Sequence, residues 1–164
     1  DEPVRYPERL AREQYVPAGN IRYFYSNGTH EFTADEHAST TKQIIVDRSG
    51  QRLYAYDSDL LFMEASISTG LQLTPTPRGT FTVYKKTPSR YMQGPLPGVS
   101  NQYYDLPGVP WNLYFTREGG VIHGAYWHDK FGRTWSHGCV NLPLSEAQKL
   151  YEWADVGTRV LVRD

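Results

Sequence analysis

The stretch KQIIVDRSGQRLYAYD, residues 42–57, contains two strand-like runs separated by a short turn. KQIIVD (42–47) and QRLYAYD (51–57) are rich in β-branched and aromatic residues, which favour extended backbone. The intervening RSG (48–50) ends in glycine, which is typical of a turn between antiparallel strands. This stretch therefore predicts a β-hairpin, and LLFMEASIST (60–69) predicts a third strand.

Further strand patterns follow toward the C-terminus. GTFTVYKK (79–86) places Phe81 and Val83 on one face of a predicted strand, and TRVLVRD (158–164) predicts the last strand. One helix is expected after residue 143, because apolar residues there recur at the spacing of a helical face. Its apolar positions are Ala147, Leu150, Tyr151 and Ala154, with a capping box at Ser145 and Gln148 and a terminating Gly157.

Length and composition fit a single ordinary domain with its own core. The chain has 164 residues, a formal net charge of −1 and one cysteine. This charge gives no general attraction to nucleic acid, and no apolar run approaches the roughly 18 residues of a membrane segment. We therefore expect no nucleic-acid partner and no integral membrane segment.

Three regions differ in composition. Residues 1–40 are polar and turn-rich, and we interpret them as an N-terminal extension, with the main domain at 41–164. Within that domain, Thr87–Val109 is rich in Pro, Gly, Ser and Tyr, and it is predicted to be a long irregular excursion. The expected architecture is a mostly β domain with one main helix and a long loop.

The single cysteine lies in TWSHGCVNLP, residues 134–143. A thiol becomes a nucleophile as thiolate, so Cys139 needs a nearby base, and an oxyanion needs backbone donors. Gly138 permits a sharp turn, so that the N–H groups of Gly138 and Cys139 could point at one oxygen. Of two candidate bases, we prefer His123, at the end of the predicted strand VIHG, over His137, which stands too close in sequence to Cys139.

This cysteine has two other interpretations. His123, His128, His137 and Cys139 could form a zinc site, but they lack the paired spacing that makes such an assignment strong. A free cysteine can also be inert and buried, as a small hydrophobic residue.

The cysteine and histidine segments resemble the signature of the L,D-transpeptidase catalytic domain of bacterial cell-wall synthesis. The resemblance covers about residues 41–164 and implies a mostly β, sandwich- or barrel-like fold, with a cleft under a mobile lid. We expect Ala125–Trp135 and the excursion Thr87–Val109 to form that cover. The matching segments are QRLYAYDSDLLFMEASISTG (51–70), TPTPRGTFTVYKK (74–86), YDLPGVPWNLYF (104–115), IHG (122–124) and SHGCVNL (136–142).

The resemblance implies a role for each matching residue. Cys139 matches the nucleophile, His123 the general base, and Gly124 the residue whose carbonyl orients the imidazole. The segment matching the pocket wall and oxyanion hole is Ser136, His137 and Gly138.

Three further residues are candidates for substrate binding: Asn141, Trp127 and Arg133. Each also has a structural interpretation: Asn141 could cap the turn before Pro143, Trp127 could belong to the core, and Arg133 could be a solvated charge. Candidate lid tyrosines are Tyr103, Tyr104 and Tyr114.

The implied reaction is acyl transfer on peptidoglycan tetrapeptide stems through a Cys thioester, with no metal and no organic cofactor. An amine of a second stem would complete a cross-link. The implied roles of such cross-links are cell-wall organisation and cell shape. Because this substrate lies outside the cytoplasmic membrane, the expected location is the cell envelope or periplasm, or the protein is secreted. The alternatives are an L,D-carboxypeptidase that uses water, and a non-catalytic wall-binding module.

Overall fold

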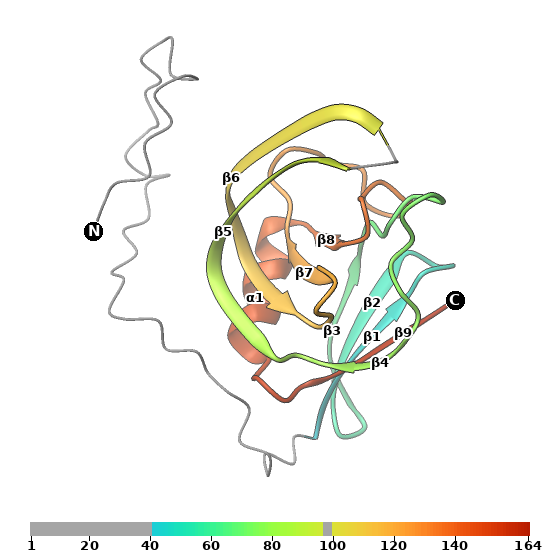
Figure 1. The fold of residues 1–164 in the computed structure, drawn as a ribbon. Coiled ribbons are helices and arrows are strands. Elements are labelled where there is room, and N and C mark those ends of the chain that lie inside the picture. The colour runs from blue at the N-terminus through green and yellow to red at the C-terminus, as the bar shows by residue number, and fades with distance from the viewer. Residues whose placement is uncertain (1–40, 97–99) are drawn as a thin grey trace, which may run out of the picture. The chain divides into compact units, whose positions relative to one another are not determined.

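The computed structural model describes residues 41–96 and 100–164, except for the side chains of 95–103. The predicted N-terminal extension, 1–40, lies outside the described residues, so its boundary at residue 41 stays a prediction. The described residues form nine strands in two sheets and one helix (Figure 1). The mostly β architecture with one main helix is therefore confirmed. No helix within these ranges is long and apolar enough to cross a membrane.

The first sheet has five strands in the order β3-β2-β1-β9-β4. Its predicted hairpin is confirmed, since β1 and β2 pair antiparallel with Ile44 opposite Ala55. β9 then returns parallel to β1, which brings the C-terminal segment into the middle of the sheet. The strands are β1 (Lys42–Asp47), β2 (Arg52–Asp57), β3 (Leu60–Ser66), β4 (Gly79–Thr82) and β9 (Arg159–Arg163).

The second sheet has four strands in the order β5-β6-β7-β8, and its last two strands are parallel. The predicted strand 79–86 is divided between the sheets, because β4 ends at Thr82 and β5 begins at Lys85. The strands are β5 (Lys85–Leu96), β6 (Ser100–Tyr114), β7 (Val121–Gly124) and β8 (Val140–Leu142).

The prediction that Thr87–Val109 is irregular is wrong. Most of this segment belongs to β5 and β6, which pair antiparallel and form the long curved ribbon in Figure 1. β5 is the edge strand of the sheet, where proline residues such as Pro88 are tolerated. Shifts of register after Arg90 and after Gly94 absorb the remaining irregularity.

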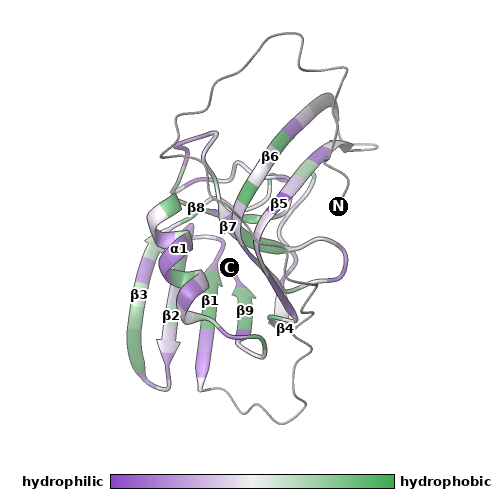
Figure 2. Cartoon of the chain, turned by 90° about the vertical axis from the view of Figure 1, so that its left-hand side faces the viewer, coloured by the Kyte–Doolittle hydropathy of each residue, from purple (hydrophilic) through white to green (hydrophobic). Residues whose placement is uncertain are grey.

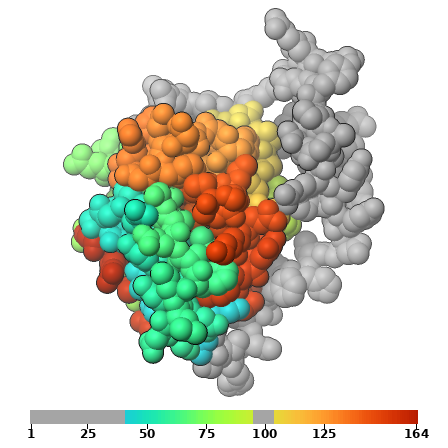
Figure 3. Space-filling model, turned by 180° about the vertical axis from the view of Figure 1, so that it is seen from behind, coloured from blue at the N-terminus to red at the C-terminus, as the bar shows by residue number. Residues whose placement is uncertain are grey.

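The core contains apolar residues from both sheets and from helix α1 (Leu144–Trp153). Hydrophobic and hydrophilic residues are interspersed along the strands of the first sheet and along α1 (Figure 2). The helix buries Ala147 and Leu150, and its Trp153 stacks on Phe62 of β3 with ring centroids 4.9 Å apart. In Figure 3 the green atoms of the β3 region accordingly lie beside the orange-red atoms of α1.

Both predicted ends of the helix are wrong. The N-cap position is Pro143, whose φ of −53° suits the start of a helix, and Ser145 lies inside the first turn, where it bonds Glu146. The helix ends at Trp153, and the N–H of Ala154 donates to the carbonyl of Leu150. Gly157 instead forms a later turn, where its φ is +100°.

Candidate active site

The parallel pairing of β7 with β8 brings the two predicted halves of the site together. In this register His123 lies opposite Asn141, and the SHGC segment runs directly into β8. The side chains of His123 and Cys139 border one cavity of about 400 Å³. The complete lining is Leu71, Met92, Tyr104, Leu106, His123, Trp127, Trp135, Ser136, His137, Cys139 and Asn141.

His123 has one ring nitrogen engaged and one available. The ring is buried, with 2% of its surface exposed, and its Nδ1 lies 3.0 Å from the carbonyl oxygen of Gly124. Because a carbonyl only accepts, Nδ1 carries the hydrogen and Nε2 keeps a lone pair. Burial lowers the pKa of His123 to about 4, although the Gly124 hydrogen bond acts in the opposite direction. The ring is therefore neutral at pH 7 and can accept a proton at Nε2.

Cys139 is partly buried, and its Sγ lies 3.7 Å from the carbonyl oxygen of Gly119. Burial raises the pKa of the Cys139 thiol above its ordinary value, while a hydrogen bond from the Val121 backbone and the charge of Arg90 act to lower it. The resting site thus contains a neutral thiol and a neutral imidazole. Such a pair requires proton transfer to the imidazole during attack.

Gly124 is a glycine for reasons of space. A Cβ at this position would lie 3.0 Å from Leu144 Cδ2 and 3.2 Å from both Ala147 Cβ and Pro110 Cγ. A side chain here would therefore require these neighbours to shift by a few tenths of an ångström, which a glycine avoids. This packing holds the Gly124 carbonyl where it accepts from His123.

Ser136 organises the backbone immediately before the cysteine. Its buried hydroxyl donates to the carbonyl oxygen of Cys139 and accepts from the N–H of Gly138 at 3.2 Å. The predicted pair of free N–H donors therefore differs from the structure, in which the Gly138 N–H is already engaged. Gly138 has a φ of +121°, a conformation that favours glycine.

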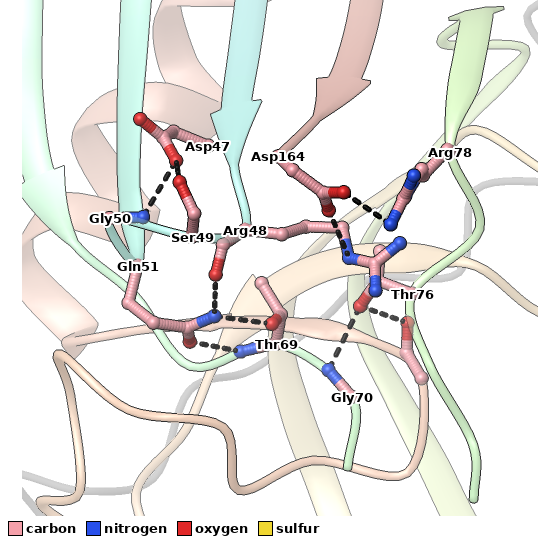
Figure 4. A network of polar contacts seen from close by, with 11 residues as sticks. Asp47, Arg48, Ser49, Gly50, Gln51, Thr69, Gly70, Thr76, Arg78 and Asp164 are labelled. Atoms are coloured by element: carbon pink, nitrogen blue, oxygen red, sulfur yellow. Dashed lines mark hydrogen bonds and ion pairs between the residues drawn. The ribbon is translucent and has the colours of Figure 1, made fainter. Parts of the chain in front are cut away.

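Thr76 also fixes this turn, and the sequence interpretation gave it no role. Its side chain is fully buried, and Oγ1 accepts from the N–H of Gly70 at 3.0 Å (Figure 4). The same hydroxyl donates to the carbonyl oxygen of Gly138 at 2.9 Å. Its position between Pro75 and Pro77 marks a rigid turn, but nothing in the sequence indicates a partner 62 residues away.

A second buried network connects the first sheet to the SHGC segment. The side chain of Gln51 donates to Thr69 Oγ1 at 2.6 Å and accepts from the Thr69 N–H at 2.9 Å (Figure 4). The Thr69 carbonyl in turn accepts from the N–H groups of Trp135 and Ser136, at 2.9 and 3.0 Å. The turn between β1 and β2 therefore helps to position the cysteine segment.

The other predicted site residues divide into two groups. Trp127 lines the cavity, with its ring 5.7 Å from that of His123, and His137 lines it as well. Asn141 lines the cavity and is buried. Arg133 is exposed and is not part of the cavity lining.

Both segments predicted to cover the cleft border the cavity. Residues 125–135 form no helix or strand and contribute Trp127 and Trp135, while β5 and β6 contribute Met92, Tyr104 and Leu106. Of the candidate tyrosines, Tyr104 lines the cavity and stacks on His137 at 5.6 Å. Tyr114 packs instead against Tyr84, and the side chain of Tyr103 lies outside the described residues.

The histidines and the cysteine are not gathered as metal ligands. In the part of the chain that the structure describes, no three His, Cys, Asp or Glu side chains form a group that could hold a metal ion. His128, the remaining candidate ligand, bonds to Asn141 instead.

A neutral histidine and a thiol on one cavity are the components of a Cys–His acyl-transfer site. The family model of the YkuD L,D-transpeptidase catalytic domain matches residues 41–162. The chain therefore belongs to the YkuD family of L,D-transpeptidase catalytic domains.

Solved structures agree with this assignment and confirm the fold class. An L,D-transpeptidase from Mycobacterium smegmatis is 27% identical, with a TM-score of 0.71, over 76% of this chain and 59% of that one. The catalytic domain of the Enterococcus faecium L,D-transpeptidase is 30% identical, with a TM-score of 0.65, over 74% of this chain and 96% of that one.

A Bacillus licheniformis protein named as an L,D-transpeptidase, YkuD, is 27% identical over 123 residues, which are 73% of this chain and 64% of that protein. The chain thus spans less than two thirds of the B. licheniformis and M. smegmatis proteins.

Proposed function

We propose that this chain is an L,D-transpeptidase that cross-links peptidoglycan stem peptides. Cys139 Sγ attacks the carbonyl between the third and fourth residues of a tetrapeptide stem, and the thiol proton passes to Nε2 of His123. His123 then returns this proton to the departing D-amino acid, whose C–N bond breaks to leave a thioester. An amine of a second stem attacks the thioester, forms the new amide and restores the Cys139 thiol through His123.

One observation carries this proposal most directly. The Gly124 carbonyl fixes the His123 tautomer, so a neutral Nε2 lone pair is available beside the cavity that Cys139 lines. Ser136 and Thr76 fix the peptide groups on either side of Gly138, which supports the Cys139 N–H as a donor to the developing oxyanion.

One relative supports covalent chemistry in this family. The enzyme Ldtfm, 30% identical with a TM-score of 0.68, has been solved as an avibactam carbamoyl enzyme. We propose that Cys139 takes up an acyl group in the corresponding way. The donor stem, the acceptor amine and a location in the cell envelope are parts of the same proposal.

Intact mass spectrometry tests this function. The chain is incubated with a tetrapeptide stem, and the expected adduct has the mass of the stem minus its terminal D-amino acid. Adding an acceptor stem should remove the adduct and produce a dimer. Release of a D-amino acid without dimer would identify the carboxypeptidase alternative, and no adduct at all would leave only a binding module.

A further inference from the structure

The imidazole of His128 has a hydrogen-bonding neighbour at each ring nitrogen. The backbone N–H of Lys130 donates to Nδ1 at 3.1 Å, and the amide of Asn141 lies 2.9 Å from Nε2. The ring is held in place by contacts with three aromatic side chains. These are Trp127, Phe131 and Trp135, with ring centroids 5.9, 5.1 and 6.3 Å from that of His128.

The Lys130 contact fixes the tautomer of His128. A backbone N–H can only donate, so Nδ1 must carry a lone pair, and the single hydrogen of the neutral ring must be on Nε2. Nε2 is therefore a donor, and the amide atom of Asn141 that faces it must be an acceptor. That atom is the oxygen Oδ1.

This tautomer also determines which end of the Asn141 amide points away from His128. The oxygen and nitrogen of an amide are nearly identical in shape, and their hydrogen-bond partners decide between the two orientations. With Nδ2 placed toward His128, two donors would meet, and Oδ1 would be buried without a partner among the described residues. Turning the amide by half a turn removes the donor–donor contact and places the donor Nδ2 at the position where Oδ1 has no hydrogen-bond partner.

Asn141 itself belongs to the active site. Asn141 is only 3% exposed, lines the same cavity as His123 and Cys139, and lies opposite His123 in the β7–β8 register. A buried amide N–H₂ needs an acceptor, and an oxygen of a ligand bound in the cavity can supply one.

We propose that His128 is a positioning residue, which orients the Asn141 amide so that Nδ2 donates to an oxygen of the stem peptide. The substrate part of this inference rests on the proposed function. The site is thereby specific for an acceptor oxygen at this point of the stem, and it disfavours an ammonium or N–H group there.

The polarity itself is tested by NMR of the ¹⁵N-labelled full chain at neutral pH. The ring ¹⁵N resonances of His128, assigned by their loss in His128→Gln, should show a protonated Nε2 and a bare Nδ1. A protonated Nδ1 with a bare Nε2 would overturn the inference. This measurement needs no substrate, so it remains decisive if the tetrapeptide does not acylate the wild-type chain and the proposed function fails.

Acylation kinetics test the role of His128 on the substrate. His128→Phe keeps an aromatic ring but removes the donor, and we expect KM for the tetrapeptide stem to rise about tenfold or more. His128→Gln should recover part of this loss, because its side-chain amide can donate to Asn141. Alkylation of Cys139 by iodoacetamide, which lacks the stem, should change by less than about threefold in both variants. An unchanged KM in His128→Phe, or equal losses with stem and iodoacetamide, would contradict the inference.

Asn141→Asp separates the two orientations of the amide. The aspartate keeps an oxygen for His128 Nε2–H but replaces the donor on the other side with a carboxylate oxygen. We expect kcat/KM for the stem to fall about a hundredfold or more while the variant remains folded. Retained activity would show that an acceptor, not a donor, serves the substrate at this position. If Asn141→Asp does not fold, the ring resonances of His128 in the wild-type chain decide the polarity, and Asn141→Ala tests whether the amide contributes to stem binding.

Discussion

The hydroxyl of Thr76 donates to the carbonyl oxygen of Gly138, and this carbonyl belongs to the same peptide group as the N–H of Cys139. Because that peptide is planar and trans, fixing the carbonyl also fixes the N–H on its opposite side. The Thr76 hydroxyl oxygen accepts from the Gly70 N–H, and the hydroxyl hydrogen of Thr76 donates to the Gly138 carbonyl. A residue in the turn before β4 thereby sets the direction of a backbone donor beside the cysteine.

Thr76→Val should damage both stability and acylation. It preserves the shape of the side chain but leaves the Gly138 carbonyl and the Gly70 N–H without their partner, which costs about 1–3 kcal/mol of unfolding free energy. We expect acylation of Cys139 by the stem to slow about tenfold or more. Urea unfolding and stopped-flow acylation measure the two effects. Thr76→Ser is the matched control and should retain most of the acylation rate; equal rates in Thr76→Val and wild type would exclude this positioning role.

Cys139→Ser should fold normally and lose acyl-enzyme formation. A serine hydroxyl is far less acidic than a thiol, and the neutral His123 is too weak a base to activate it at a useful rate. Intact mass spectrometry after incubation with a tetrapeptide stem detects any adduct, and circular dichroism checks the fold. An adduct that forms at the wild-type rate would show that Cys139 is not the nucleophile.

His123→Ala should lose the activated thiol, whereas His137→Ala should keep it. His123 is buried with one nitrogen fixed by Gly124, while His137 is exposed and stacks on Tyr104. The pH dependence of alkylation at Cys139 in both variants measures the difference. Loss of the reactive thiol only in His137→Ala would assign the base to His137.

The acidic limb of the kcat/KM profile should lie far below the range of an ordinary histidine. Burial lowers the pKa of His123 to about 4, so the ring stays neutral and able to accept a proton until the pH falls to that region. An ordinary histidine would lose this capacity near pH 6.5. A midpoint near 6.5 would show that the base on the acidic limb does not have the lowered pKa of the buried His123.

The stability of the fold must be followed in the same experiment. A histidine whose folded-state pKa is lowered binds fewer protons when folded than when unfolded, so the unfolding free energy falls as the pH drops below about 6.5. Circular dichroism at each pH separates this effect from the titration of the active site.

Within residues 125–135, the amides other than the hydrogen-bonded N–H groups of Ala125, Lys130, Gly132 and Trp135 should exchange quickly, and exchange should slow when Cys139 is acylated. This segment has no helix or strand and places Trp127 and Trp135 on the cavity. A thioester must be shielded from water until an amine arrives, and closure of a loop is the usual means. In 87–109, the paired part of β5 and β6 should exchange more slowly from the start. Exchange rates that acylation leaves unchanged in both segments would identify passive surface structure.

Local sequence patterns were sufficient for the elements whose pattern is strong. The runs rich in β-branched and aromatic residues at 42–47 and 51–57 determine the first hairpin, and the spacing of Ala147 and Leu150 determines the helical face. The ends of that helix were missed, because Pro143 set its start and no side chain capped it. The resemblance at IHG and SHGCVNL was sufficient for the family.

The tertiary structure decided everything that depends on contacts between distant segments. Proline and glycine in Thr87–Val109 indicate an irregular loop locally, but an edge strand with register shifts accommodates them once β6 supplies a partner. The carbonyl that Thr76 reaches, and the amide whose polarity His128 sets, lie 62 and 13 positions away in the chain. Hydrogen bonds of this kind are directional and require their two atoms to lie within about 3 Å of each other. They therefore form only when the two sheets bring these turns together, and no local periodicity of the sequence encodes that arrangement.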